Sequence, residues 1–267
     1  MGSSEINSRQ VSAQRAYELM LRRKERFIEY QRVQETTRSC KRDIARMIAA
    51  GLSRRSVARI GLLPCDTGVL ARELHLLFPR AEFVLVDQNA RALAACAESM
   101  MNCVRVRLVQ SDVENIQFGP ILDLAVIHLA LHLFRLPDGL VAVRDSLSPR
   151  GRLVVVTKTE EQRLAHPMSS FFSLRGAPSV FVCAKPAADL LCATGFAVDA
   201  VTAFNRDVVV RVEEIPLVFA RNSNSFMRRQ SVKGVREFHS FLSSLALRGN
   251  VKFRLGYTLL VCRKRCQ

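Results

Sequence analysis

The pattern of apolar and polar positions divides the chain into a helical start followed by alternating strands and helices. From residue 9 to about residue 50 there is almost no Gly or Pro, and apolar residues recur at helical spacing among basic ones, which predicts one long helix or two shorter ones. After Gly51, short β-rich runs alternate with helical runs, as in a parallel sheet with crossover helices. The pattern predicts strands over residues 58–63, 82–87, 104–110, 122–127 and 152–157, with helices over 67–78, 90–101 and 137–147.

The last third of the chain is less regular. The helix over 137–147 is expected to stop before a turn, Ser-Pro-Arg-Gly at 148–151, and residues 158–186 resemble an irregular insertion. The elements expected after it are a helix over 187–194, strand-like runs over 197–204 and 207–212, a helix marked by apolar positions from 232 to 245, and a closing strand over 252–263. We therefore expect a basic helical extension over 1–55 and one α/β domain over 56–267, whose basic end covers 221–267.

Length and composition favour one large intracellular domain. With 267 residues and 49% apolar content the chain can bury a sizeable core. No apolar run approaches the roughly 18 residues that span a bilayer, and no secretory signal is visible, so membrane insertion is not expected. The eight cysteines lack paired metal-ligand spacing, so we expect reduced thiols and no metal.

Positive charge is concentrated at the two ends of the chain. Residues 1–55 carry 13 Lys/Arg against 6 Asp/Glu and residues 221–267 carry 11 against 1, while residues 56–220 are nearly neutral. Arginine, the commoner cation, suits bidentate binding of phosphate, so we hypothesise binding to RNA or a ribonucleoprotein; the alternative is an Arg-rich solvated surface. No aromatic RNA-recognition motif is visible, so the protein would recognise the phosphate backbone and the shape of an RNA and not its bases. The candidate contacts are Arg22, Arg23, Lys24, Arg26, Arg228, Arg229, Lys233, Arg236, Arg263, Lys264 and Arg265.

Three positions after predicted strands form a candidate nucleotide crevice. A Gly-bearing turn follows the first strand, an acid closes the second, and another acid follows the third. In such sheets the turn offers backbone N–H groups and a helix N-terminus to the ligand. The first acid accepts hydrogen bonds from the ribose hydroxyls, and the third position reaches the base. The candidate ligand-binding residues are Pro64, Asp66, Thr67, Gly68, Asp87, Gln88, Asp112, Val113 and His128.

Taken together, these segments resemble the class I S-adenosylmethionine-dependent methyltransferases. LVQSDVENIQF is similar to the adenine-side segment of that family, and LDLAVIHLALHLF followed by DSLSPRGRLVVV is similar to its fourth strand, active-site edge and turn into strand five. The Leu-x-Leu-His pattern ending at His132 is most similar to the quinone-biosynthesis branch. The resemblance implies a doubly wound, Rossmann-like, seven-stranded sheet with an antiparallel last strand, and S-adenosylmethionine held at the first loop, Asp87 and Asp112.

The first loop departs from the family pattern. The family has acid-x-Gly-x-Gly-x-Gly, where this chain has Leu62, Pro64, Asp66 and Gly68. Pro64 lacks a backbone donor, and Asp66 places a Cβ where the chain normally passes close to the ligand. Leu62 cannot replace the acid that helps to orient the methionine part of the cofactor. We expect cofactor binding to be weakened or lost.

Several of these residues have a structural interpretation as well. Asp87 either binds ribose or caps the following helix. His128 and His132 could act in acid–base chemistry or position a substrate. The commoner case is that such histidines are core or rim residues whose hydrogen bonds are satisfied within the protein. The Asn/Asp-Pro-Pro-aromatic motif of amino-group methyltransferases is missing after the fourth strand, where the chain reads His-Leu-Ala-Leu.

Three functions remain in view. The first is a methyltransferase-like pseudoenzyme that docks on structured RNA or a ribonucleoprotein, as a ribosome component or assembly factor. The second is an active methyltransferase on RNA or a quinone-like acceptor, since methyl transfer from a sulfonium needs mainly positioning. The third is a protein–protein scaffold. The expected compartment is the mitochondrial matrix or the cytoplasm, with the mitochondrion favoured.

Overall fold

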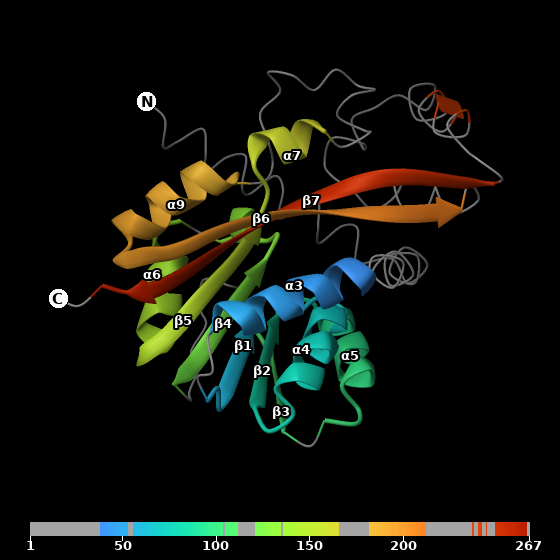
Figure 1. Cartoon of the computed structure of the whole chain (residues 1–267). Coiled ribbons are helices and arrows are strands. Elements are labelled where there is room, and N and C mark those ends of the chain that lie inside the picture. The colour runs from blue at the N-terminus through green and yellow to red at the C-terminus, as the bar shows by residue number, and fades with distance from the viewer. Residues whose placement is uncertain are drawn as a thin grey trace.

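A computed structural model describes residues 38–52, 56–103, 105–111, 121–134, 136–165, 182–211, 237, 240–241, 244 and 249–265. Its strands form one seven-stranded sheet in the order β3-β2-β1-β4-β5-β7-β6 (Figure 1). The strands are β1 (Arg59–Leu62), β2 (Glu82–Asp87), β3 (Val106–Gln110), β4 (Leu122–His128), β5 (Leu147–Thr157), β6 (Phe196–Arg211) and β7 (Asn250–Lys264). The helices are α3 (Arg38–Gly51), α4 (Val69–Leu77), α5 (Ala90–Ser99), the 3-10 helix η1 (Leu131–Leu133), α6 (Asp138–Ser146), α7 (Glu160–Leu164) and α9 (Ala184–Ala193).

The sheet has the predicted topology. Strands β1 to β5 pair in parallel, and β7 is inserted antiparallel between β5 and β6. This confirms the doubly wound α/β fold with an antiparallel last strand. Because β1 lies next to both β2 and β4, the direction of winding reverses between β1 and β4, which is where doubly wound sheets bind ligands.

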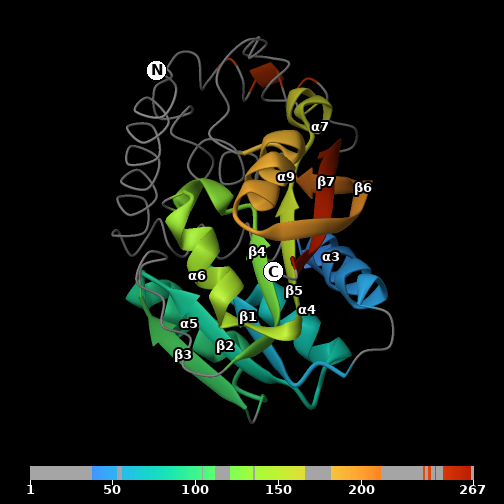
Figure 2. The same cartoon turned by 90° about the vertical axis from the view of Figure 1, so that its left-hand side faces the viewer.

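Helices cover both faces of the sheet and bury two apolar clusters. Alternate residues of β2 point to opposite faces, so Phe83 packs in one cluster and Val84 in the other. The first cluster includes the apolar faces of α3, α4 and α5, and the second includes those of α6 and α9. Figure 2 shows α3 on one side of the central strands and α6 with α9 on the other. Within the described residues, no helix combines the length and apolar character needed to cross a bilayer.

Two predicted boundaries were wrong. The segment 148–151 does not precede the fifth strand as a turn. Strand β5 begins at Leu147, and the stretch from Leu147 to Arg152 faces only Leu122 to Leu124, so the segment forms an irregularity inside the strand. The two strand-like runs after Gly195 are one strand, β6, because its pairing with β7 continues through Asn205 and Arg206.

Other predictions lie partly outside the described residues. The basic extension is described only from α3 onward, and the predicted helix over 232–245 only at residues 237, 240, 241 and 244, which are helical. The insertion contains α7, whose N-terminus has a capping box between Thr159 and Gln162, and it ends where α9 begins at Ala184.

Gly68 holds the turn between β1 and α4 in a conformation that a side chain would strain. Its φ is +79°, and a Cβ there would lie 2.9 Å from Cys96 Cα and 3.1 Å from Ser99 Cβ. We expect Gly68→Ala to lower the free energy of unfolding by about 2 kcal/mol, from the left-handed backbone and the crowding together. Urea denaturation measures the loss. Gly249→Ala is the matched control, since Gly249 has a φ of +77° with nothing within 4 Å of an added Cβ; an equal loss in both variants would show that backbone strain alone acts.

Candidate cofactor crevice

The first loop lies at the carboxyl end of β1, beside the carboxyl end of β4. Backbone bonds tie it to both neighbouring strands: Leu63 N–H donates to Val126 O at 3.0 Å and Cys65 N–H donates to Val86 O at 2.7 Å. Asp66 has a φ of +54°, in the left-handed region. The loop therefore keeps a backbone conformation that favours glycine at the position where the family pattern has one, although this chain has aspartate there.

Asp87 is tied into the chain at the end of β2. Its side chain is 1% exposed, and its two oxygens accept from the backbone N–H groups of Asp66 at 3.1 Å and Asn89 at 2.9 Å. Burial raises the pKa of Asp87 to about 7, with the Asp66 charge adding to the effect and the backbone hydrogen bonds opposing it. Asn89, not Asp87, caps α5, since it accepts from Arg91 N and Ala92 N. Asp87 thus holds the first loop and the capping residue together, and ribose binding stays a prediction.

Lys41 of α3 extends to the carboxyl end of β4, where the candidate cofactor crevice lies. Its side chain is buried, and its Nζ lies 3.2 Å from Nδ1 and 3.3 Å from Nε2 of His128, at the carboxyl end of β4. Lys41 was not among the site residues predicted from the sequence, because it lies among the cations of a predicted basic helix. A signal was available: Lys41 shares helical spacing with Ala45 and Ile48, which are buried on the core-facing side of α3.

Burial dominates the electrostatics around Lys41. It lowers the pKa of Lys41 to about 8, against the opposing effect of the Asp66 carboxylate. Burial, together with the charges of Lys41 and Lys158, lowers the pKa of His128 well below its ordinary value. Burial also lowers the pKa of His132, in η1, to about 4. Both imidazoles are therefore neutral near pH 7, and Lys41 is mostly charged.

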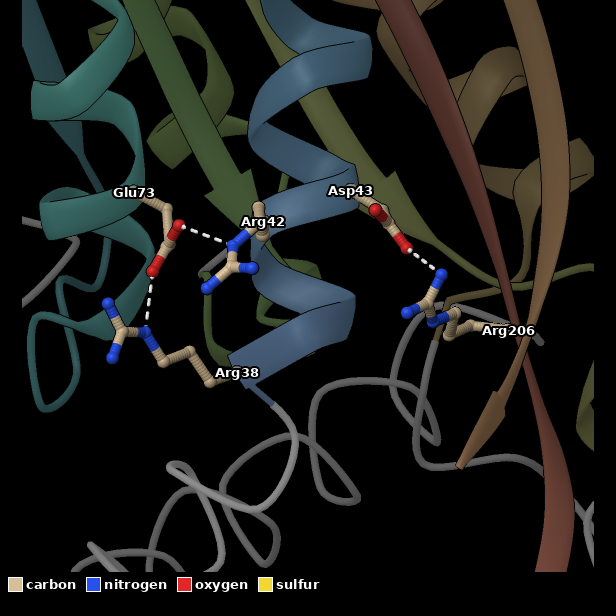
Figure 3. A network of polar contacts seen from close by, with 5 residues as sticks. All are labelled: Arg38, Arg42, Asp43, Glu73 and Arg206. Atoms are coloured by element: carbon tan, nitrogen blue, oxygen red, sulfur yellow. Dashed lines mark hydrogen bonds and ion pairs between the residues drawn. The ribbon is translucent and has the colours of Figure 1, made fainter. Parts of the chain in front are cut away.

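Ion pairs fix α3 over the crevice (Figure 3). On one side, Glu73 of α4 is 2% exposed and pairs with Arg38 Nε at 2.7 Å and Arg42 Nε at 3.3 Å. On the other side, Asp43 pairs with Nη1 of Arg206, in β6, at 3.1 Å. Together with the buried apolar face of α3, these contacts hold Lys41 in place.

Neutralising Glu73 is expected to loosen α3. Glu73→Gln keeps the volume of the side chain but removes the charge that both guanidinium groups contact, and those groups are 39% and 48% exposed, so water can partly replace the lost contacts. We expect a loss of about 1–2 kcal/mol in the free energy of unfolding. Urea denaturation measures it, with Glu82→Gln as the control, because Glu82 is 35% exposed and pairs only with Arg59 among the described ion pairs. Equal losses in the two variants would contradict a special role for Glu73.

The remaining predicted site residues fall into three groups. Pro64, Thr67 and Gln88 lie in or beside the crevice loops, and Thr67 is buried with no hydrogen-bond partner for its hydroxyl within the described structure. Arg263 pairs with Asp199 at 2.8 Å and lies opposite Arg152, toward the start of β5, so it is at the other end of the strands from the crevice. Lys264 and Arg265 follow it. Those outside the described residues are Asp112, Val113, Arg22, Arg23, Lys24, Arg26, Arg228, Arg229, Lys233 and Arg236.

Comparison with known proteins identifies the fold. Residues 63–151 match the family model described as a methyltransferase domain. The chain has the class I methyltransferase fold. It is similar to the plantazolicin methyltransferase BpumL in complex with SAH (S-adenosylhomocysteine), with 13% identity, 98% of each chain covered and a TM-score of 0.58. It is also similar to a Bacillus halodurans protein described as a putative methyltransferase, with 15% identity, 82% of this chain and 99% of that one covered and a TM-score of 0.55. No curated protein matches the sequence.

The described residues fit a sulfonium cofactor poorly. The ammonium of Lys41 lies at the point where the winding of the sheet reverses, and like charges in a partly desolvated site repel one another. Asp87 is almost fully buried, and burial raises its pKa to about 7, so near neutral pH it is a weaker acceptor for ribose hydroxyls than an ionised carboxylate would be. In the described part of the chain, no group of three or more His, Cys, Asp or Glu side chains is placed to hold a metal ion.

Proposed function

We propose that this protein keeps the class I methyltransferase fold but binds S-adenosylmethionine weakly, and that it acts by docking its basic ends on structured RNA or a ribonucleoprotein, as a ribosome component or assembly factor. The observation that carries the first half is Lys41, which is buried in the crevice and in contact with His128. S-adenosylmethionine carries a positive sulfonium, whereas its demethylated product is a neutral thioether. A crevice lined by an ammonium disfavours the first more than the second.

Charge segregation supports the second half of the proposal. The nearly neutral middle of the chain lies between two strongly basic ends. In the described part of β7, acids of β6 already contact some of the cations: Asp207 pairs with Lys252 at 2.8 Å and with Arg254 at 3.1 Å. Those side chains are 67% and 69% exposed, so phosphate can still reach them. Most of the RNA-binding surface is then expected from the other cations at the two ends.

Two measurements on the full chain test the proposal. Titration calorimetry should give weaker binding for S-adenosylmethionine than for S-adenosylhomocysteine. Retention of a structured RNA should fall steeply with salt, with a slope that reflects several released counterions. Tight binding of S-adenosylmethionine combined with a flat salt dependence would overturn the proposal. Circular dichroism confirms that the fold is intact in each sample.

A second candidate function is an active methyltransferase on RNA or a quinone-like acceptor. The observation that favours it is the first loop, where Asp66 and Gly68 both retain left-handed backbone conformations despite the changed sequence. In addition, the structurally similar BpumL was solved with SAH. This function predicts micromolar binding of both ligands and methyl transfer that Asp87→Ala reduces.

A further inference from the structure

A second cation, half-buried, lies at the carboxyl end of β5, beside the strand that carries His128. Lys158 follows β5 directly, and its Nζ lies 5.6 Å from the ring centroid of Tyr257, on the neighbouring strand β7. Lys41 and Lys158 both lower the pKa of His128, so their charges act on the same imidazole from two elements, α3 and the end of β5. Lys41 thus contacts His128 directly, and Lys158 lies two residues beyond Val156, the residue of β5 that pairs with His128.

The acids of the described structure compensate these cations only in part. Asp66 favours the charged form of Lys41. For Lys158, the described groups that oppose the effect of burial are cysteine sulfurs and not a carboxylate, and burial raises the pKa of the Cys40 thiol, so that thiol is uncharged near pH 7. Burial outweighs these contributions at both lysines and lowers each pKa to about 8. Near pH 7 the crevice therefore holds more positive than negative charge close to His128.

A buried ammonium whose charge is only partly compensated is costly, and a bound anion would reduce that cost. Lys41 is 6% exposed, whereas Lys158, His128 and Asp66 are half-buried, so solvent and small solutes can reach these three groups. Lys41 Nζ lies almost equally far from the two ring nitrogens of His128, so it is not aligned with the lone pair of either one, and the N–H of the neutral imidazole can donate to an anion.

We propose that this part of the crevice binds a small oxyanion, the carboxylate or phosphate group of a free small molecule, between Lys41 and Lys158, with His128 as a third donor. The ring of Tyr257, buried and stacked on Phe204 at 5.5 Å between centroids, forms the wall beneath Lys158. This site goes beyond the proposed function, because it depends neither on the basic ends nor on binding of a sulfonium. The phosphate groups of RNA offer the same chemistry, and the test separates the two sources.

The test uses the full chain, inorganic phosphate and succinate. At constant ionic strength with chloride as the reference, both anions are expected to raise the melting temperature and to shift the His128 ring signals in NMR spectra of histidine-labelled protein, assigned with His128→Gln. Lys158→Met should weaken phosphate binding by roughly tenfold or more. Lys185→Met is the matched control, since Lys185 is 88% exposed and pairs with Asp189; it should bind phosphate as the unaltered chain does.

Three results would overturn the inference. One is the absence of any response to phosphate or succinate in the unaltered chain. Another is equal phosphate binding by Lys158→Met and Lys185→Met. The third is a shift of the His128 signals with an RNA oligonucleotide but with neither small anion, which would assign the crevice to RNA phosphate. Because the His128 signals report on the crevice alone, failure here leaves the salt-dependent RNA test unaffected.

Discussion

Lys41→Met is expected to raise the affinity for S-adenosylmethionine relative to that for S-adenosylhomocysteine by roughly thirtyfold to a hundredfold. A sulfonium that bound about 6 Å from the ammonium would be repelled by about 2–3 kcal/mol at an effective dielectric constant of about 20, which corresponds to that factor. The two ligands share an ammonium and a carboxylate, so only the sulfonium charge distinguishes them. The ratio of the two dissociation constants, measured by calorimetry, therefore isolates the effect of the Lys41 charge from changes in packing.

The matched control for this prediction is Arg46→Met. Arg46 is on the same helix but exposed, so its removal changes the net charge equally without altering the crevice. We expect it to leave the ratio unchanged. A parallel loss of affinity for both ligands in Lys41→Met would contradict the prediction, since it would mean that Lys41 binds a part that the two ligands share. That result would favour the active methyltransferase.

The elements of the sheet were largely predictable from the sequence, because the core strands are short apolar runs buried on both faces. The second strand was predicted over 82–87 and observed as Glu82–Asp87. Where the prediction failed, pairing between distant segments overrode local signals. Pro149 and Gly151 are typical of a turn, yet β5 begins at Leu147, opposite Leu122.

The candidate site was predictable only in part. Asp66 and Asp87 follow neighbouring parallel strands and lie close together, as expected. The backbone N–H of Asp66 donates to the Asp87 carboxylate at 3.1 Å. The occupation of the crevice by Lys41 could not be derived in the same way. It depends on how α3 packs against strand ends that lie 87 residues further along the chain, and a cation in a basic helix is usually solvated.

Asp87→Asn is expected to remove a large part of the pH dependence of stability. The pKa of Asp87 is about 7 in the folded protein against an ordinary value of 3.8, so the folded state retains a proton that the unfolded state has already lost. The stabilisation linked to this proton is complete below about pH 4 and is lost as the pH rises through 7. Between pH 5 and pH 8 the loss amounts to about 2–3 kcal/mol.

Because asparagine does not titrate, the free energy of unfolding of the variant should rise by about 2–3 kcal/mol relative to that of the unaltered chain between pH 5 and pH 8. Its amide group can accept only at one oxygen, so one of the backbone N–H groups of Asp66 and Asn89 loses its acceptor, at a pH-independent cost of about 1–3 kcal/mol. Urea denaturation at several pH values separates the two effects. Asp189→Asn, at a side chain that is 70% exposed, is the control and should change stability little at any pH.

Parallel pH profiles for Asp87→Asn and the unaltered chain would mean that Asp87 is ionised in the fold. Its oxygens would then be charged acceptors, which a ribose needs more than a protonated acid, and the case for cofactor binding would be stronger.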